Sequence, residues 1–129
     1  MRVLALDFGA ARTGVAVTDA SGTIARQLTV VERAATPTGL ARIHALVREQ
    51  AAERIVVGMP LTLRGERGSQ ARQTDAFVAA LRSVVDVPVE TLDERFTTAI
   101  ATQRGGAADE DARAAAHLLE SYLLRLGRG

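Results

Sequence analysis

The chain alternates short apolar runs with stretches whose apolar residues recur at helical spacing. Residues 2–8 are almost continuously apolar, which is typical of a central strand covered on both faces. Residues 13–19 form a second such run and can pair back on the first through the glycine turn at 9–12. A third strand is expected at 23–32, which contains three consecutive β-branched residues. Three strands in succession predict an antiparallel meander.

Helices and strands alternate in the rest of the chain. Apolar residues at 40, 43, 46 and 47 predict a helix that opens at Pro37 and ends near Ala52. The later expected elements are a short buried strand at 54–58, a helix after Ser69, a strand at 87–92, a short helical segment at 96–103 and a last helix from about 109 to 126. This order predicts an α/β fold in a single domain, residues 1–129, with a mixed five-stranded sheet flanked by helices.

The composition narrows the classes of function. A length of 129 residues suits one self-sufficient core, and 3% aromatic residues argue against a surface that stacks several bases. The net charge is only +1, so a nucleic-acid binding face would have to concentrate the 16 basic residues, all of them arginine. The absence of cysteine excludes disulfides and thiolate metal sites. No signal peptide and no apolar run of about 18 residues is present, so we expect a soluble, cytoplasmic protein without a membrane segment.

Acidic residues follow the predicted strands at positions that should converge. Asp7 ends the first strand, and Asp93 and Glu94 follow the fifth. The carboxyl ends of parallel strands share one edge of a sheet, where function collects in open α/β folds. Asp111 lies in the first turn of the last helix, on its apolar stripe, so its side chain should point toward the sheet. We therefore expect three or four carboxylates at one edge.

Such a cluster would be unfavourable without a cation, because the carboxylates repel one another and at least one pKa would rise. Ligands that are all oxygen favour Mg²⁺ or Mn²⁺. Two such ions roughly 3.5 to 4 Å apart can activate water and stabilise the leaving oxygen of a phosphodiester. The pattern thus predicts metal-dependent phosphodiester hydrolysis.

Each acid also has a purely structural interpretation. Asp111 can serve as a favourable charge at a helix N-terminus, Asp93 and Glu94 can be solvated loop residues, and Asp7 can be a hydrogen-bonded structural carboxylate. The residues by themselves leave these alternatives open.

Several arginines lie close to the acids along the chain. Arg12 follows the turn after Asp7, and Arg95 directly follows Glu94. Arg64, Arg67 and Arg72 lie in the loop and helix that follow Pro60. We expect these five side chains to bind phosphates of a nucleic acid beside the metals. The alternative is that they are ordinary solvated surface residues.

Four segments in chain order resemble one known family, the YqgF/RuvX pre-16S rRNA nucleases, which are also described as Holliday junction resolvase-like proteins. The match runs almost end to end. It rests on Leu6-Asp7-Phe8-Gly9 with Arg12-Thr13-Gly14-Val15-Ala16-Val17, on Ile55-Val56-Val57-Gly58-Met59-Pro60-Leu61, on Asp93-Glu94-Arg95-Phe96-Thr97-Thr98, and on Asp111 leading into Leu118-Leu119-Glu120-Ser121-Tyr122-Leu123.

The resemblance implies an RNase H-like fold and a catalytic metal site. The metal ligands would be Asp7, Glu94 with Asp93 as its rival, and Asp111, holding Mg²⁺ or Mn²⁺. The implied activity is a divalent-metal-dependent endonuclease acting on structured nucleic acid, with maturation of the 16S rRNA 5′ end as the leading expectation. The alternatives are a resolvase of branched DNA and a non-catalytic ribosome or nucleic-acid binding module. A monomer and a homodimer are both compatible, and a stable dimer would favour the resolvase.

Two departures from the family pattern concern the grip on nucleic acid. Many relatives carry a basic residue where this chain has Ala11, and a longer basic connection where residues 105–110 are short, with only Arg104 just upstream. A different class, the actin-like and sugar-kinase ATPases, also has an Asp-x-Gly after its first strand. Those proteins need a second lobe, for which this chain has no room.

Overall fold

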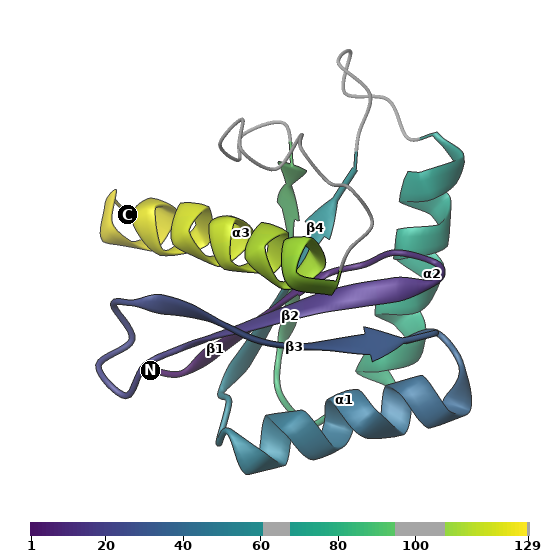
Figure 1. Cartoon of the computed structure of the whole chain (residues 1–129), viewed down its shortest axis with the longest axis horizontal. Helices are drawn as coiled ribbons and strands as arrows, with labels where there is room; N and C mark the ends of the chain where they lie inside the picture. Colours follow the sequence, from purple (N-terminus) through teal and green to yellow (C-terminus); the bar gives the residue numbers. More distant parts are fainter. Residues whose placement is uncertain (61–67, 95–107, 129) are drawn as a thin grey trace.

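The computed structural model describes residues 1–60, 68–94 and 108–128 (Figure 1). Its elements are β1 (Val3–Asp7), β2 (Arg12–Thr18), β3 (Ala25–Glu32), α1 (Pro37–Glu49), β4 (Arg54–Met59), α2 (Ser69–Arg82), β5 (Val89–Asp93) and α3 (Ala108–Arg128). The short helical segment predicted at 96–103 lies outside the described residues. The other predicted elements are all present, with ends shifted by a few residues.

The strands form one mixed sheet in the order β3-β2-β1-β4-β5. β1 and β2, and β2 and β3, pair antiparallel, which confirms the meander. β4 lies parallel to both β1 and β5, as expected for strands joined by helical crossovers. All five residues of β1 are buried, which agrees with a continuous apolar run at the centre of a sheet.

Helices cover both faces of the sheet (Figure 1). α1 and α2 bury Ile43, Phe77 and Leu81 in one apolar cluster with Leu4 and Leu6 of β1. α3 buries a second cluster on the other face, made of Ala115, Leu118 and Leu119 with alternate residues of β1, β2 and β4. The odd and even residues of β1 therefore belong to different cores, as the two-residue period of a strand requires.

Local chemistry explains the shifted element ends. Thr36 caps α1 by accepting a hydrogen bond from the Gly39 N–H at 3.2 Å, and α1 ends at Glu49, shortly before Ala51 adopts a left-handed φ of 53°. β5 begins after Pro88, which has no N–H to donate to the ladder. Among the described residues, no helix is long and apolar enough to span a membrane.

Candidate active site

The acidic residues lie at one edge of the sheet. β1 ends at Asp7 and β5 ends at Asp93, with β4 between the two strands. Because β1, β4 and β5 are mutually parallel, their carboxyl ends share this edge. Asp7 is only 5% exposed, which confirms the expectation of a buried carboxylate at the end of the central strand.

Strand alternation separates Asp7 from Asp93. Ala5 packs in the cluster under α3, so Asp7, two residues further along β1, faces α3 as well. Leu92 belongs to the same cluster, so its neighbour Asp93 faces α1 and α2 instead. Asp93 is therefore placed less well than Asp7 to join a site on the α3 face.

Glycine 14 brings the start of α3 against the sheet beside Asp7. Gly14 is the register partner of Asp7 in the β1–β2 pair. A Cβ atom on Gly14 would lie 1.8 Å from the backbone oxygen of Asp111, so only glycine allows this approach of helix and strand. Asp111 is held next to the end of β1 by this contact, and its side chain is 15% exposed. The predicted orientation of Asp111 toward the sheet is confirmed.

Glycine 58 performs the same function for Glu94. A Cβ atom on Gly58 would lie 2.9 Å from Cγ, Cδ and Oε1 of Glu94, so the Glu94 side chain folds over β4. Gly58 follows Val57, the register partner of Leu6, and is therefore level with Asp7. This placement brings Glu94 toward β1 and favours it over Asp93 as the second acid of the site.

Arg12 forms an ion pair with Asp111. Its Nε atom lies 3.0 Å from Asp111 Oδ2, and the two side chains are 36% and 15% exposed. The geometry is not that of a hydrogen bond, and within the described residues Asp111 Oδ2 is a buried oxygen with no hydrogen-bond partner. The sequence predicted that Arg12 would bind phosphate, whereas here its guanidinium rests on one of the predicted metal ligands.

The donor chemistry fits Mg²⁺ or Mn²⁺, although the ligands are not gathered around one point. Within residues 1–60, 68–94 and 108–128, no three Asp, Glu or His side chains lie close enough together to hold a metal ion. Asp7, Glu94 and Asp111 nevertheless offer only carboxylate oxygens. Within the described residues Asp111 Oδ2 is buried and accepts no hydrogen bond, and the Arg12 guanidinium lies beside it, so a metal ion there would replace a cation that is already present. The metal-ligand set therefore remains a prediction with a suitable set of donors.

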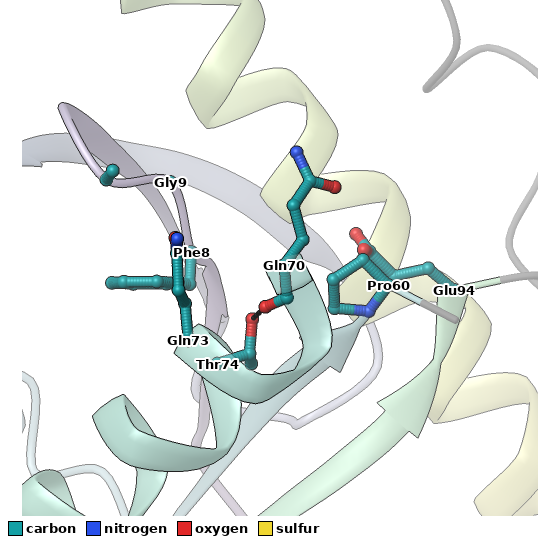
Figure 2. A pocket seen from close by; sticks show the side chains of 8 residues that line it. Phe8, Gly9, Pro60, Gln70, Gln73, Thr74 and Glu94 are labelled. Carbon is teal, nitrogen blue, oxygen red and sulfur yellow. Dashed lines mark hydrogen bonds between the residues drawn. The ribbon is translucent and has the colours of Figure 1, made fainter. Parts of the chain in front are cut away.

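A pocket of about 180 Å³ adjoins the acidic edge (Figure 2). One side is formed by Phe8 and Gly9, which follow Asp7, and the opposite side by Pro60 and Glu94. The first turns of α2 complete it with polar side chains; the residues involved are Gln70, Gln73 and Thr74. Since Glu94 lines the pocket, a group bound there would lie next to the Glu94 carboxylate.

The polar side of this pocket was not predicted from the sequence. Thr74 Oγ1 donates to the Gln70 carbonyl at 2.9 Å, and the Phe8 ring stacks on Phe77 with centroids 4.4 Å apart. Pocket walls that come from four separate segments have no local sequence signature. Glycines at 14 and 58, inside predicted strands, were a usable signal, because an interior glycine often marks a close approach of another segment.

Of the four other arginines that the sequence predicts to bind phosphate, the structure describes one. Arg72 is exposed on α2. Arg64, Arg67 and Arg95 lie outside the described residues, so their expected contacts stay predictions.

The sequence matches known proteins over almost its whole length. A family model described as "RuvX: Holliday junction resolvase" matches residues 1–125. A Chloroflexus aurantiacus protein with the provisional name pre-16S rRNA nuclease is 46% identical over 101 residues, which cover 78% of this chain and 66% of that protein. A Moorella thermoacetica protein of the same name is 37% identical over 99% of this chain and 98% of its own length. This chain thus spans just under two-thirds of the first relative and nearly all of the second.

A solved structure confirms the fold class. T. thermophilus RuvC, solved in complex with a Holliday junction substrate, superposes with a TM-score of 0.61 over 98% of this chain and 96% of that chain. The sequence identity is 20%, so this similarity concerns the fold alone, which is RNase H-like.

Proposed function

Because the chain belongs to the RuvX Holliday junction resolvase family, we propose that it is a divalent-metal-dependent endonuclease that hydrolyses phosphodiester bonds in structured nucleic acid. The proposed substrate is the 5′ end of pre-16S rRNA, in the cytoplasm. The observation that carries the proposal is the placement of Asp7, Glu94 and Asp111 at one edge of the sheet, through the close approaches at Gly14 and Gly58. The names of the relatives from Chloroflexus and Moorella support the choice of substrate.

The described residues would divide the work as follows. Asp7, Glu94 and Asp111 would hold Mg²⁺ or Mn²⁺, and the bound metal would activate water and stabilise the leaving oxygen. Asp7 is buried at the end of the central strand, so its position is fixed before the metal arrives. Arg12 and Arg72 would bind substrate phosphates, together with Arg64, Arg67 and Arg95 as the sequence predicts. The pocket beside Glu94 would hold a nucleotide group next to the scissile phosphate.

A branched-DNA resolvase is the second candidate, and the description of the family favours it. A resolvase must cut two opposing strands, so it needs two active sites in a stable dimer. A stable dimer in solution would support the resolvase, and a strict monomer would count against it.

The test is cleavage of a structured RNA that spans the 16S 5′ boundary and of a four-way DNA junction, each with Mn²⁺, Mg²⁺ or chelator. We expect cleavage with metal, none with chelator, and none by Asp7→Asn. Asp86→Asn, a change of the same type at an exposed position, is the matched control and should cleave normally. Cleavage that persists in Asp7→Asn, or that ignores chelator, would contradict the metal mechanism.

A thermal melt in chelator checks that the Asp7 variant is informative. Asp7→Asn should be as stable as the parent protein or more stable, because it removes one of several mutually repelling charges. A marked destabilisation would assign Asp7 a structural role instead.

A further inference from the structure

A basic hollow lies beside Arg12, the residue that contacts Asp111 at the acidic edge. Two adjoining open hollows, of about 750 and 550 Å³, lie between the end of β3 and the start of α1 and share Arg12, Glu32 and Thr38. Besides Arg12 they are lined by Arg33 and Arg42. Glu32 is the acidic residue among their lining, so positive charge predominates.

Arg33 has a backbone conformation that arginine does not favour. Its φ is 48°, in the left-handed region that glycine and asparagine adopt more readily. The turn is fixed from several directions: the Arg33 N–H donates to the Ala11 carbonyl at 3.0 Å, and Thr36 Oγ1 donates to the Arg33 carbonyl at 2.7 Å. A Cβ atom on Gly39 would lie 2.3 Å from that same carbonyl oxygen. The backbone conformation at position 33 therefore does not explain why the residue is an arginine. Strained backbone positions of this kind occur preferentially at functional sites.

The side chains of Arg33 and Arg42 are available to a ligand. Arg33 is exposed and forms no ion pair within the part of the chain that the structure describes. Arg42 is 50% exposed, and its contact with Glu49 is a surface ion pair at 3.6 Å with a partner that is 56% exposed. Such a pair is weak and is easily replaced by a phosphate, which accepts two parallel hydrogen bonds from a guanidinium.

We propose that Arg33 and Arg42, together with Arg12, form a phosphate track that holds the sugar–phosphate backbone of the nucleic acid on the β3–α1 side of the acidic edge. This proposal rests on the proposed nuclease function and names its substrate-binding surface. Arg12 connects the track to the acids, because it contacts Asp111 and lines both hollows. Among the described residues, no aromatic side chain lines either hollow, so the track would contact phosphates without reading bases.

The test is binding of a fluorescent RNA hairpin and a four-way DNA junction in chelator, measured by anisotropy over a series of salt concentrations. Arg33→Gly and Arg42→Ala are the test variants, alone and combined. Arg33→Gly removes the guanidinium and suits the left-handed φ, so its melting temperature should be unchanged or higher. Arg48→Ala is the matched control. Arg48 is exposed on α1, the helix that carries Arg42, but lies six residues and about 9 Å beyond Arg42 along that helix.

Each test variant should weaken binding several-fold and lower the slope of log K against log salt. A lost phosphate contact is worth about 0.9 in that slope for duplex DNA, so the double variant should lose close to 2. Ligands of different sequence should be affected equally, and Arg48→Ala should leave the slope unchanged.

The outcomes distinguish this proposal from the function on which it rests. If the parent protein binds and cleaves but the double variant keeps its slope, the track is wrong and the nuclease function stands. If the double variant loses about two units of slope but no substrate is cleaved under any condition, the track is supported and the nuclease function fails. A parent protein that binds neither ligand overturns both.

Discussion

Two arginine–carboxylate clusters lie against helix α3, one near each end, and they differ in how completely they are hydrogen-bonded. Near the start of α3, Arg12 Nε lies 3.0 Å from Asp111 Oδ2. Further along, Arg54 Nε lies 3.1 Å from Glu90 Oε2. In the second cluster Tyr122 completes the network, because its hydroxyl accepts from Arg54 Nη1 at 2.8 Å and donates to Glu90 Oε2 at 2.6 Å.

The two ion pairs have nearly equal lengths, so distance does not reveal their roles. The Arg54–Glu90–Tyr122 cluster satisfies its charges internally, at the amino ends of β4 and β5, where α/β sheets rarely bind ligands. The Arg12–Asp111 pair leaves a buried oxygen without a hydrogen bond among the described residues, at the carboxyl end of the sheet. The first pair is thus less completely hydrogen-bonded than the second, and its position at the carboxyl end of the sheet favours a function at that end of α3 and a structural role at the other.

Exchanging one acid in each cluster for its amide gives the largest expected contrast. Asp111→Asn should reduce cleavage by about a thousandfold or more, since it would remove one of the proposed metal ligands. Its free energy of unfolding in chelator should change by less than about 1 kcal/mol. Glu90→Gln should change activity by no more than a few-fold. It should lower the free energy of unfolding by about 1 kcal/mol, a modest loss because solvent screens a side chain that is 45% exposed.

Cleavage rates and urea denaturation of both variants test this contrast. If Glu90→Gln lost activity as severely as Asp111→Asn while remaining folded, the division into a functional and a structural cluster would be wrong.

Gly14→Ala tests the packing that positions Asp111. The new Cβ atom would lie 1.8 Å from the Asp111 carbonyl oxygen, and neither backbone can move away cheaply. We expect a loss of about 1 to 3 kcal/mol, in the range typical of overpacking, together with reduced activity because the start of α3 is displaced. Urea denaturation measures the loss of stability, and a parallel cleavage assay measures the loss of activity.

The sequence predicted the parts of this comparison that depend on local pattern. The apolar runs and helical periods predicted the order of strands and helices, and Asp7 at the end of a continuous apolar run predicted a buried acid. The stripe that Asp111 shares with Ala115 and Leu118 predicted that its side chain would face the sheet, and both of these apolar residues are buried there.

The parts that depend on long-range approach could not be predicted. Arg54, Glu90 and Tyr122 come from three separate elements, and none has a pattern that distinguishes it from a surface residue. Arg12 was assigned to phosphate because it follows Asp7 in sequence, whereas only the fold shows that α3 brings Asp111 to it. The preference for Glu94 over Asp93 rests on the contact of the Glu94 side chain with Gly58, which lies on a different strand.

Tyr122→Phe tests the structural cluster by pH. Burial and the hydrogen bond to Glu90 raise the pKa of Tyr122 above its usual 10, so the fold favours the neutral phenol. That contribution is complete below pH 10 and is lost as pH rises through the higher pKa of the folded state. We expect Tyr122→Phe to cost about 1 kcal/mol at neutral pH and to flatten the decline of stability above pH 10.

Tyrosinate absorbance measures this pKa directly, because Tyr122 is the one tyrosine of the chain. A titration midpoint at or below 10 in the folded protein would contradict the role of Tyr122 as the internally satisfied centre of the cluster.

Arg12→Ala should have the smallest effect on stability and the most specific effect on metal binding. The pair with Asp111 is partly exposed on the Arg12 side, so we expect a change within about 0.5 kcal/mol in the free energy of unfolding. If a metal ion must displace the guanidinium to reach Asp111 Oδ2, removing Arg12 should tighten Mn²⁺ binding several-fold in calorimetry without nucleic acid. Arg26→Ala, at an exposed position of β3, is the matched loss of charge and should leave Mn²⁺ binding unchanged. Weaker Mn²⁺ binding in Arg12→Ala alone would mean that Arg12 orients Asp111 for the metal, and the two clusters would then differ less than their hydrogen bonds indicate.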